Sequence, residues 1–98
     1  MWSIFNRKQP PQQQVTTGRF EIEQSSQIAY LDYTLTANIL ELIHTEVPEA
    51  LRNLGLSSAL AENALNYARE HNLKVDIVCP LVRRYIEKHP EYADLEMK

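Results

Sequence analysis

The sequence predicts an α+β domain in which an antiparallel three-strand meander is followed by a β-α-β-α segment, giving a compact fold with a mixed sheet. Three observations predict it. Hydrophobic residues alternate with a period of two between Phe20 and Val47. They recur with the period of an amphipathic helix from Leu56 to Ala68. A short apolar run, Val75–Val78, follows that helix, as expected for a strand that is covered on both faces.

Residues 1–18 are expected to form a disordered N-terminal tail, and residues 19–98 the single domain that a chain of 98 residues has room for. The tail is rich in proline, glutamine and threonine and offers little to bury. It also contains a small apolar cluster formed by Trp2, Ile4 and Phe5. The alternative to a free end is docking of this cluster on a partner or a second copy, so we expect a monomer or a weak homodimer.

The first two predicted strands form a hairpin. Phe20–Glu23 alternates between apolar and acidic residues, and Gln27–Leu35 continues the alternation after the pair Ser25-Ser26. In the second strand, one face is expected to carry Ala29, Leu31, Tyr33 and Leu35.

The third predicted strand, Ile39–Val47, follows a turn in which Asn38 is expected to take the left-handed conformation. Strict alternation would place His44 and Glu46 on the same face as the strand's leucines, Leu40 and Leu42.

The helix after this strand is expected to begin after Gly55 and to end near Asn72. The crossover through it makes the fourth strand parallel to the third, with a right-handed connection. Pro80 suits the first position of a final helix, roughly Leu81–Lys88, which His89-Pro90 ends.

The bulk composition limits the classes of function. A formal net charge of −3 argues against a nucleic-acid partner, because phosphate contacts need a concentrated basic face. No apolar run approaches the ~20 residues of a membrane helix, so we expect no membrane partner. The single cysteine, Cys79, cannot form an internal disulfide, which suits a reducing compartment. We therefore expect a soluble cytoplasmic protein, without a metal.

The segment between the third strand and the helix is the most informative. Free backbone N–H groups and the positive end of the helix dipole can hold an anion at a helix N-terminus. Gly55 permits a positive φ or the close approach of a ligand. Ser57 and Ser58 add hydroxyl donors, and Arg52 adds a cation suited to phosphate. On these grounds alone, a plain structural turn remains the alternative.

Arg52-x-x-Gly55-x-Ser57 resembles the acetyl-CoA signature of the GNAT acetyltransferases, [Arg/Gln]-x-x-Gly-x-[Gly/Ala], with Ser57 in place of the usual Gly or Ala. Two further stretches, His44–Pro48 and Val78–Pro80 with the later His89–Tyr92, are similar to short single-domain GNAT-like proteins of the YjdJ type. The resemblance covers about residues 20–95.

The resemblance implies that acetyl-CoA is the cosubstrate and that the loop amides wrap its pyrophosphate. The residues implied in binding it are Val47, Arg52, Asn53, Leu54, Gly55, Leu56, Ser57 and Ser58. Tyr85 either lines the CoA channel or packs in the core. Arg83, Arg84 and Lys88 form a solvated face of the final helix or contact the 3′-phosphate of CoA.

The resemblance also implies that the acetylated arm lies between the two parallel strands, with the reaction near His44, Glu46 and Cys79. Histidine is the natural base near neutral pH, and Glu46 is a second base or orients the acceptor. Cys79 precedes a helix N-terminus, where a thiolate is favoured, so it is a candidate nucleophile or acid. Packing roles for His44 and Cys79 are the alternatives.

The predicted function is therefore transfer of an acetyl group from acetyl-CoA to a primary amine of unknown identity. Larger family members carry two helices between their first strands, where this chain has only Ser25-Ser26. The acceptor surface is then open, completed by another chain, or vestigial. A CoA-binding sensor or interaction module with little turnover is the alternative function, and a structural module without a ligand is the third.

Overall fold

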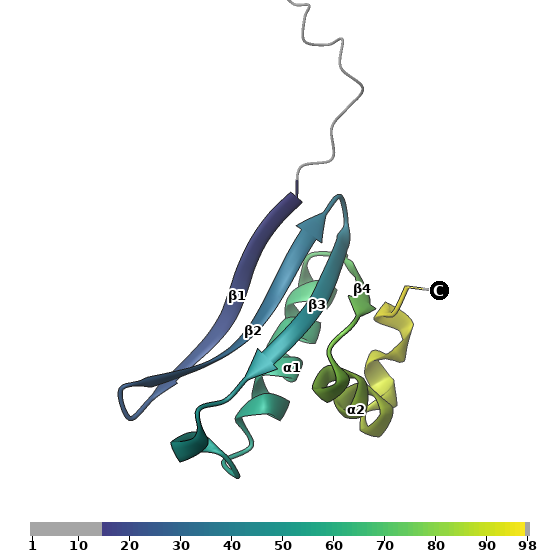
Figure 1. Ribbon diagram of the computed structural model, residues 1–98. Helices are drawn as coiled ribbons and strands as arrows, with labels where there is room; N and C mark the ends of the chain where they lie inside the picture. The colour runs from purple at the N-terminus through teal and green to yellow at the C-terminus, as the bar shows by residue number, and fades with distance from the viewer. Residues whose placement is uncertain (1–14, 98) are drawn as a thin grey trace, which may run out of the picture.

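The structure of the protein is a computed structural model, which describes residues 15–97. Four strands form one sheet in the order β1-β2-β3-β4 (Figure 1). The elements, in chain order, are β1 (Val15–Gln24), β2 (Gln27–Thr36), β3 (Ile39–Glu46), η2 (Glu49–Leu51), α1 (Leu56–Glu70), β4 (Lys74–Ile77), α2 (Pro80–Lys88) and η3 (Pro90–Leu95). The first three strands pair antiparallel and β4 pairs parallel to β3, which confirms the predicted α+β class.

Strand β1 begins at Val15 rather than at Phe20, so the part of the predicted tail from 15 to 18 belongs to the sheet. Val15 pairs with Thr36, and Gly18 pairs with Tyr33. Residues 15–18 are part of an edge strand because of their backbone pairing with β2 and their β-branched side chains. They lack the apolar alternation that indicates a buried face. A Cβ at Gly18 would lie 2.6 Å from the Tyr33 hydroxyl, so glycine makes room for that ring. The rest of the predicted tail, 1–14, lies outside the described residues.

The turn between β2 and β3 corrects one prediction. The left-handed residue is Ala37, with a φ of 55°, and not Asn38. The Asn38 carbonyl accepts a hydrogen bond of 2.9 Å from the Lys74 amide, so Asn38 is already held at the start of the β3–β4 pairing. The hairpin at Ser25-Ser26 is confirmed, and both serines have a positive φ, as a two-residue turn of type I′ requires.

A bulge in β3 overturns the predicted faces of that strand. Tyr33 pairs with Leu42 but Asp32 pairs with His44, which leaves Ile43 as the extra residue. One extra residue reverses the alternation beyond it. Leu40, Leu42 and Thr45 therefore face the core, whereas His44 and Glu46 are exposed on the opposite face.

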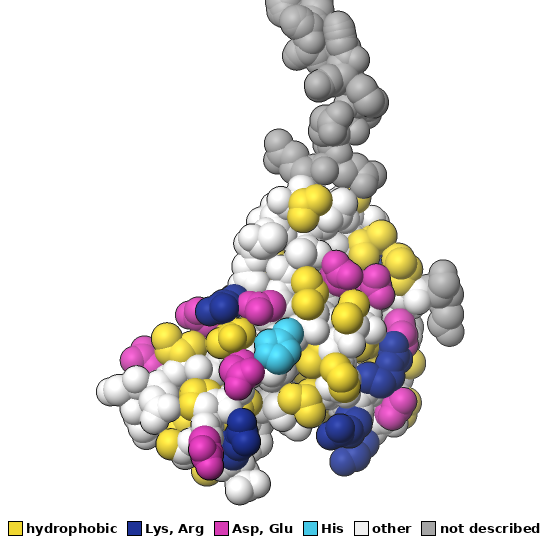
Figure 2. All heavy atoms as spheres, viewed as in Figure 1, with side chains coloured by type: hydrophobic (Ala, Val, Ile, Leu, Met, Phe, Trp, Pro, Cys, Tyr) yellow, Lys and Arg dark blue, Asp and Glu magenta, His cyan; other side chains and the backbone are white. Residues whose placement is uncertain are grey.

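The helices lie on one side of the sheet. Helix α1 packs against all four strands, and α2 packs against α1, β3 and β4 (Figure 1). The predicted apolar stripe of α1 is confirmed, since its buried residues are Leu56, Leu60, Ala61, Ala64, Leu65 and Ala68. The helix ends as predicted, with His71 at the C-cap and Asn72 at a φ of 56°. No helix in the described chain covers the other face of the sheet, where hydrophobic and acidic side chains are interspersed (Figure 2).

The end of the described chain adds structure that the sequence did not predict. After η3, the Met97 amide donates to the Val75 carbonyl at 2.8 Å, so this segment lines the free edge of β4. Arg69 of α1 binds Asp94 with both terminal nitrogens, at 2.9 and 3.1 Å. No helix between residues 15 and 97 is both long enough and apolar enough to cross a membrane.

Candidate functional site

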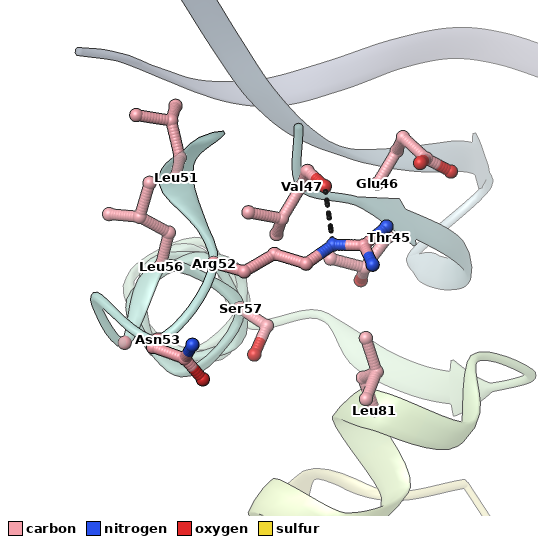
Figure 3. A pocket seen from close by; sticks show the side chains of 10 residues that line it. Thr45, Glu46, Val47, Leu51, Arg52, Asn53, Leu56, Ser57 and Leu81 are labelled. Carbon is pink, nitrogen blue, oxygen red and sulfur yellow. Dashed lines mark hydrogen bonds between the residues drawn. The ribbon is translucent and has the colours of Figure 1, made fainter. Parts of the chain in front are cut away.

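A cavity of about 300 Å³ lies where the end of β3 meets the beginning of α1 (Figure 3). Ten residues line it, namely Thr45, Glu46, Val47, Leu51, Arg52, Asn53, Gly55, Leu56, Ser57 and Leu81. Six of these are residues that the sequence assigned to cofactor binding: Val47, Arg52, Asn53, Gly55, Leu56 and Ser57. Of the other predicted residues, Leu54 is exposed and outside the cavity, and Ser58 and Tyr85 line a neighbouring one.

The turn before α1 leaves backbone donors free at this cavity. Gly55 is the N-cap, with a φ of 77°, and no side chain caps the helix. The first intrahelical bond runs from the Ala59 amide to the Gly55 carbonyl, so the amides of Leu56, Ser57 and Ser58 have no helical acceptor. A Cβ at Gly55 would have no atom within 4 Å, so there is open space beside this residue. Glycine is favoured here because of the positive φ and not because of crowding.

The Arg52 side chain lies across the cavity mouth. Its Nε donates to the Val47 carbonyl at 3.3 Å, which aims the guanidinium along the end of β3 (Figure 3). Among the described residues, its two terminal nitrogens form no ion pair or hydrogen bond. They remain available to a bound anion.

The pairing of β3 with β4 stops just before the site. It runs from Ile39–Lys74 to Leu42–Ile77, and the amides of Val78 and Cys79 then both donate to the Leu42 carbonyl. Predicted strand residue Val78 is thus outside β4, because the chain turns away there toward α2. The β3 backbone beyond Leu42 has no strand partner on this side among the described residues.

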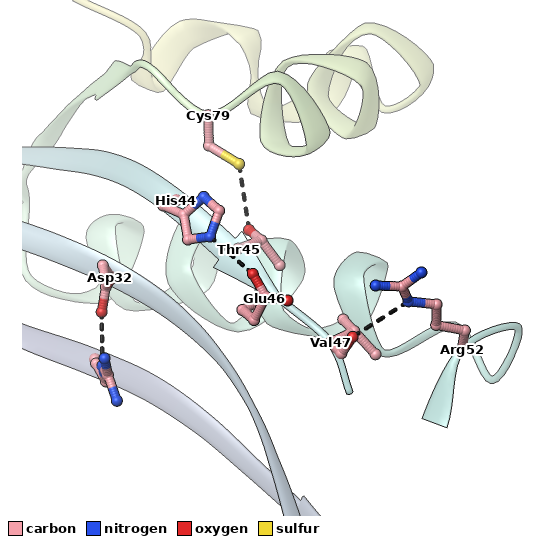
Figure 4. A network of polar contacts seen from close by, with 8 residues as sticks. Asp32, His44, Thr45, Glu46, Val47, Arg52 and Cys79 are labelled. Atoms are coloured by element: carbon pink, nitrogen blue, oxygen red, sulfur yellow. Dashed lines mark hydrogen bonds and ion pairs between the residues drawn. The ribbon is translucent and has the colours of Figure 1, made fainter. Parts of the chain in front are cut away.

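His44 and Glu46 form the exposed polar pair of the site. His44 Nε2 and Glu46 Oε1 are 3.1 Å apart, and the side chains are 56% and 48% exposed (Figure 4). The Tyr30 ring stands edge-on to the imidazole, with centroids 6.5 Å apart. Glu46 lines the cavity and His44 does not, so the carboxylate connects the cavity with the histidine.

Cys79 and Thr45 form a second, buried pair. The sulfur lies 3.2 Å from the Thr45 hydroxyl, with Cys79 2% and Thr45 7% exposed (Figure 4). Thr45 lines the cavity, whereas Cys79 lies behind it and does not. Sequence reasoning missed Thr45, because only the bulge turns it inward and no residue pattern signals that bulge.

The structure therefore brings His44 to Glu46 and Cys79 to Thr45, and no hydrogen bond joins the two pairs. Tyr85 is partly buried on α2, and burial, followed by the charge of Glu62, raises the pKa of its phenol. Between residues 15 and 97, no three His, Cys, Asp or Glu side chains lie together in a group that suits a metal ion.

The structure defines an α+β domain with a mixed sheet, in which free helix amides and a glycine turn lie at the end of one parallel strand. The model of the GCN5-related N-acetyltransferase family matches residues 19–95, so the chain belongs to that family. This confirms the GNAT resemblance; the narrower YjdJ type stays a prediction.

Curated relatives share part of their length with this chain. Protein NATD1 of Gallus gallus is 38% identical over 52 residues, which are 53% of this chain and 47% of that protein. The human Protein NATD1 is also 38% identical over 52 residues, with 46% of it covered. Protein NATD1 of Danio rerio is 33% identical over 57 residues, which are 56% of this chain and 52% of that protein. The chain thus spans about half the length of the curated relatives it matches.

Proposed function

We propose that this chain is an N-acetyltransferase domain that uses acetyl-CoA as donor and a primary amine as acceptor. The observation that carries the proposal is the convergence of free helix amides, the Gly55 turn and the Arg52 guanidinium on one cavity. Such a convergence suits a pyrophosphate, since each group offers a donor or a positive charge. The family membership supports a cosubstrate of this class.

The residues that would hold the pyrophosphate are the amides of Leu56–Ser58, the Ser57 hydroxyl and the free nitrogens of Arg52. The β3 backbone beyond Leu42, which has no strand partner on the β4 side, would hold the arm that carries the acetyl group. Acetyl-CoA supplies the acetyl group as an activated thioester. Binding, orientation and proton transfer would be carried out by side chains and backbone groups of this chain.

His44 is the proposed base. An ionised Glu46 carboxylate only accepts hydrogen bonds, so His44 must carry its proton on Nε2 to bond with it. In the neutral ring with this tautomer, Nδ1 is unprotonated and able to take the proton of the acceptor amine. Glu46 holds the ring in that tautomer and so orients it.

The acceptor would approach over the uncovered face of the sheet. His44 and Glu46 lie on that face because of the bulge, and no helix of the described chain blocks it. This supports the open form of acceptor surface among the three that the sequence left open. We propose a soluble, cytoplasmic protein without a metal.

A CoA-binding module with little turnover is the second candidate function. The burial of Cys79 behind Thr45 favours it, because that thiol is not at the cavity surface. Both functions predict CoA binding, and only the enzyme predicts CoA release that depends on an added amine.

Calorimetric titration with CoA tests the shared part of the proposal. Gly55→Val should weaken binding at least about tenfold, since a β-branched side chain strains the left-handed turn and would fill the open space through which a ligand reaches it. Ala37→Val is the matched control, because Ala37 also has a positive φ but lies in the distant β2–β3 turn. Equal CoA affinity in the two variants would mean that the Gly55 turn is not part of the binding site.

A further inference from the structure

Strand β1 forms an open edge of the sheet (Figure 1). Within residues 15–97 it pairs with β2 alone, over all ten residues of the strand and without a bulge. The other edge of the sheet, at β4, is lined by the segment after η3, through the hydrogen bond from the Met97 amide to the Val75 carbonyl. Of the two edges, β1 is therefore the one that offers unpaired backbone groups along its full length.

The hairpin turn determines which backbone groups of β1 point outward. Gln24 and Gln27 are the first and fourth residues of the two-residue turn, so they form a hydrogen-bonded pair. Hydrogen-bonded and non-hydrogen-bonded pairs alternate along an antiparallel ladder. The residues whose N–H and C=O groups point away from β2 are then Val15, Thr17, Arg19, Glu21 and Glu23.

Nothing in β1 protects this edge against pairing. Proteins protect an edge strand with a proline, a bulge or a charged side chain that points inward, and the ten residues of β1 contain none of these. The side chain at its centre on the helix side is Phe20, whose ring centroid lies 4.9 Å from that of Tyr33 and 5.5 Å from that of Tyr67. The charged side chains, Arg19, Glu21 and Glu23, all lie on the opposite face, and they carry both signs.

We propose that β1 pairs antiparallel with β1 of a second copy of this chain, with the two-fold axis at Phe20. In this register Arg19 lies opposite Glu21 of the second copy, and Thr17 lies opposite Glu23 of the second copy. All four are residues with outward N–H and C=O groups, so they form the hydrogen-bonded pairs of the new ladder. The inference is independent of the proposed function, because it requires no ligand.

Charge selects this register over its neighbours. Moving the axis to Arg19 would place two arginines opposite each other, and moving it to Glu21 would place two glutamates opposite each other. An axis further toward either end of β1 would shorten the ladder and form no ion pair. The axis at Phe20 forms an ion pair on each side of the centre and opposes no like charges. The strand is thus complementary to a second copy of itself.

The dimer would extend contacts that the single chain already has. Arg19 binds Asp32 of β2 at 2.7 Å, so in the dimer its guanidinium would lie between this carboxylate and Glu21 of the second copy. On the other face, the two Phe20 rings would meet at the axis as a cross-strand aromatic pair. The axis is perpendicular to the sheet, so the helices of both copies lie on one side. The uncovered faces, each with a His44–Glu46 pair, join into one surface on the other side.

Sedimentation equilibrium of the full chain tests the proposal, since it measures the dissociation constant of the dimer. The wild type should dimerise with a Kd below about 1 mM. Glu21→Arg should weaken the dimer about tenfold or more, because it opposes two cations on both sides of the axis. Glu70→Arg, on the exposed surface of α1, is the control with the same change in charge and should keep the wild-type Kd.

Exchange of the charges tests the register itself. Arg19→Glu should weaken its own dimer as Glu21→Arg does, and an equimolar mixture of the two variants should dimerise again, because their charges are then complementary. Thr17→Pro needs no change of charge. It removes an outward N–H, which the pairing with β2 does not use, and should also weaken the dimer. Melting temperatures establish that each variant is folded.

A wild type that is monomeric throughout this range would overturn the proposal. A dimer that withstands both Glu21→Arg and Thr17→Pro would also overturn it, and loss of that dimer on replacing Trp2 and Phe5 by alanine would assign it to the apolar cluster of the first residues. With both charge variants folded, a mixture that stays monomeric would overturn the register.

Discussion

Thr45 Oγ1 and Cys79 Sγ lie 3.2 Å apart, and of the two residues only Thr45 reaches the cavity. The bulge at Ile43 produces this arrangement, because it turns Thr45 toward the core and His44 and Glu46 away from it. Two kinds of chemistry are thereby divided between the faces of one strand. The buried face offers the Thr45 hydroxyl, which lies against the Cys79 thiol at the start of α2, and the exposed face offers an imidazole and a carboxylate.

Thr45→Val should weaken CoA binding several-fold, since it removes the hydroxyl that lines the cavity at nearly constant volume. Thr45→Ser keeps the hydroxyl and should bind normally. Calorimetry on both variants checks this. Unchanged affinity in Thr45→Val would mean that the hydroxyl serves only Cys79.

Cys79→Ala separates the catalytic hypothesis for Cys79 from its packing role. The burial of the sulfur leads us to expect a stability loss of about 1–2 kcal/mol, from a small cavity and an unpaired Thr45 hydroxyl, with CoA affinity unchanged. Melting temperature and turnover are measured on one preparation. Loss of most transfer, together with loss of any acetyl-enzyme seen by intact mass, would restore Cys79 as a catalytic residue.

His44→Gln should lower acetyl transfer about 100-fold or more while CoA binds as in the wild type, because the base is lost and the cavity is untouched. Single-turnover CoA release checks the rate, and calorimetry checks the binding. Ile43→Val, on the same bulge, is the control for a change that only repacks the sheet. Full activity in His44→Gln would mean that His44 is not the base and would leave Glu46 as the candidate.

Much of the fold follows from patterns that the sequence contains. The apolar residues from Leu56 to Ala68 recur with a helical period and so predict a helix, and the serine pair predicts the hairpin. The bulge at Ile43 cannot be predicted in this way, because a strand with one extra residue contains the same kinds of residue as a strand without it. The position of Thr45 and the exposure of His44 both depend on it. The docking of η3 through Asp94 depends on contacts between segments far apart in the chain, which local patterns do not encode.

Acid should weaken the attachment of η3 to α1. The hydrogen bond from Arg69 lowers the pKa of Asp94, so the contribution of Asp94 to stability is present above its unfolded-state pKa and is lost as the pH falls through the folded value. Asp94→Asn should therefore melt below the wild type at neutral pH, and the difference should vanish in acid. Thermal melts from about pH 7 to pH 2 check this. A difference that is constant with pH would assign the loss to packing.

Amine-dependent release of CoA from acetyl-CoA tests the proposed acetyltransferase activity most directly. The wild type is incubated with acetyl-CoA and a panel of polyamines, amino acids and peptides, beside Gly55→Val, His44→Gln and the control Ala37→Val. We expect release with at least one amine in the wild type and in Ala37→Val, and little release in the other two variants. Wild-type protein that binds CoA but shows no amine-dependent release with any of these acceptors would contradict the acetyltransferase proposal and favour the CoA-binding module.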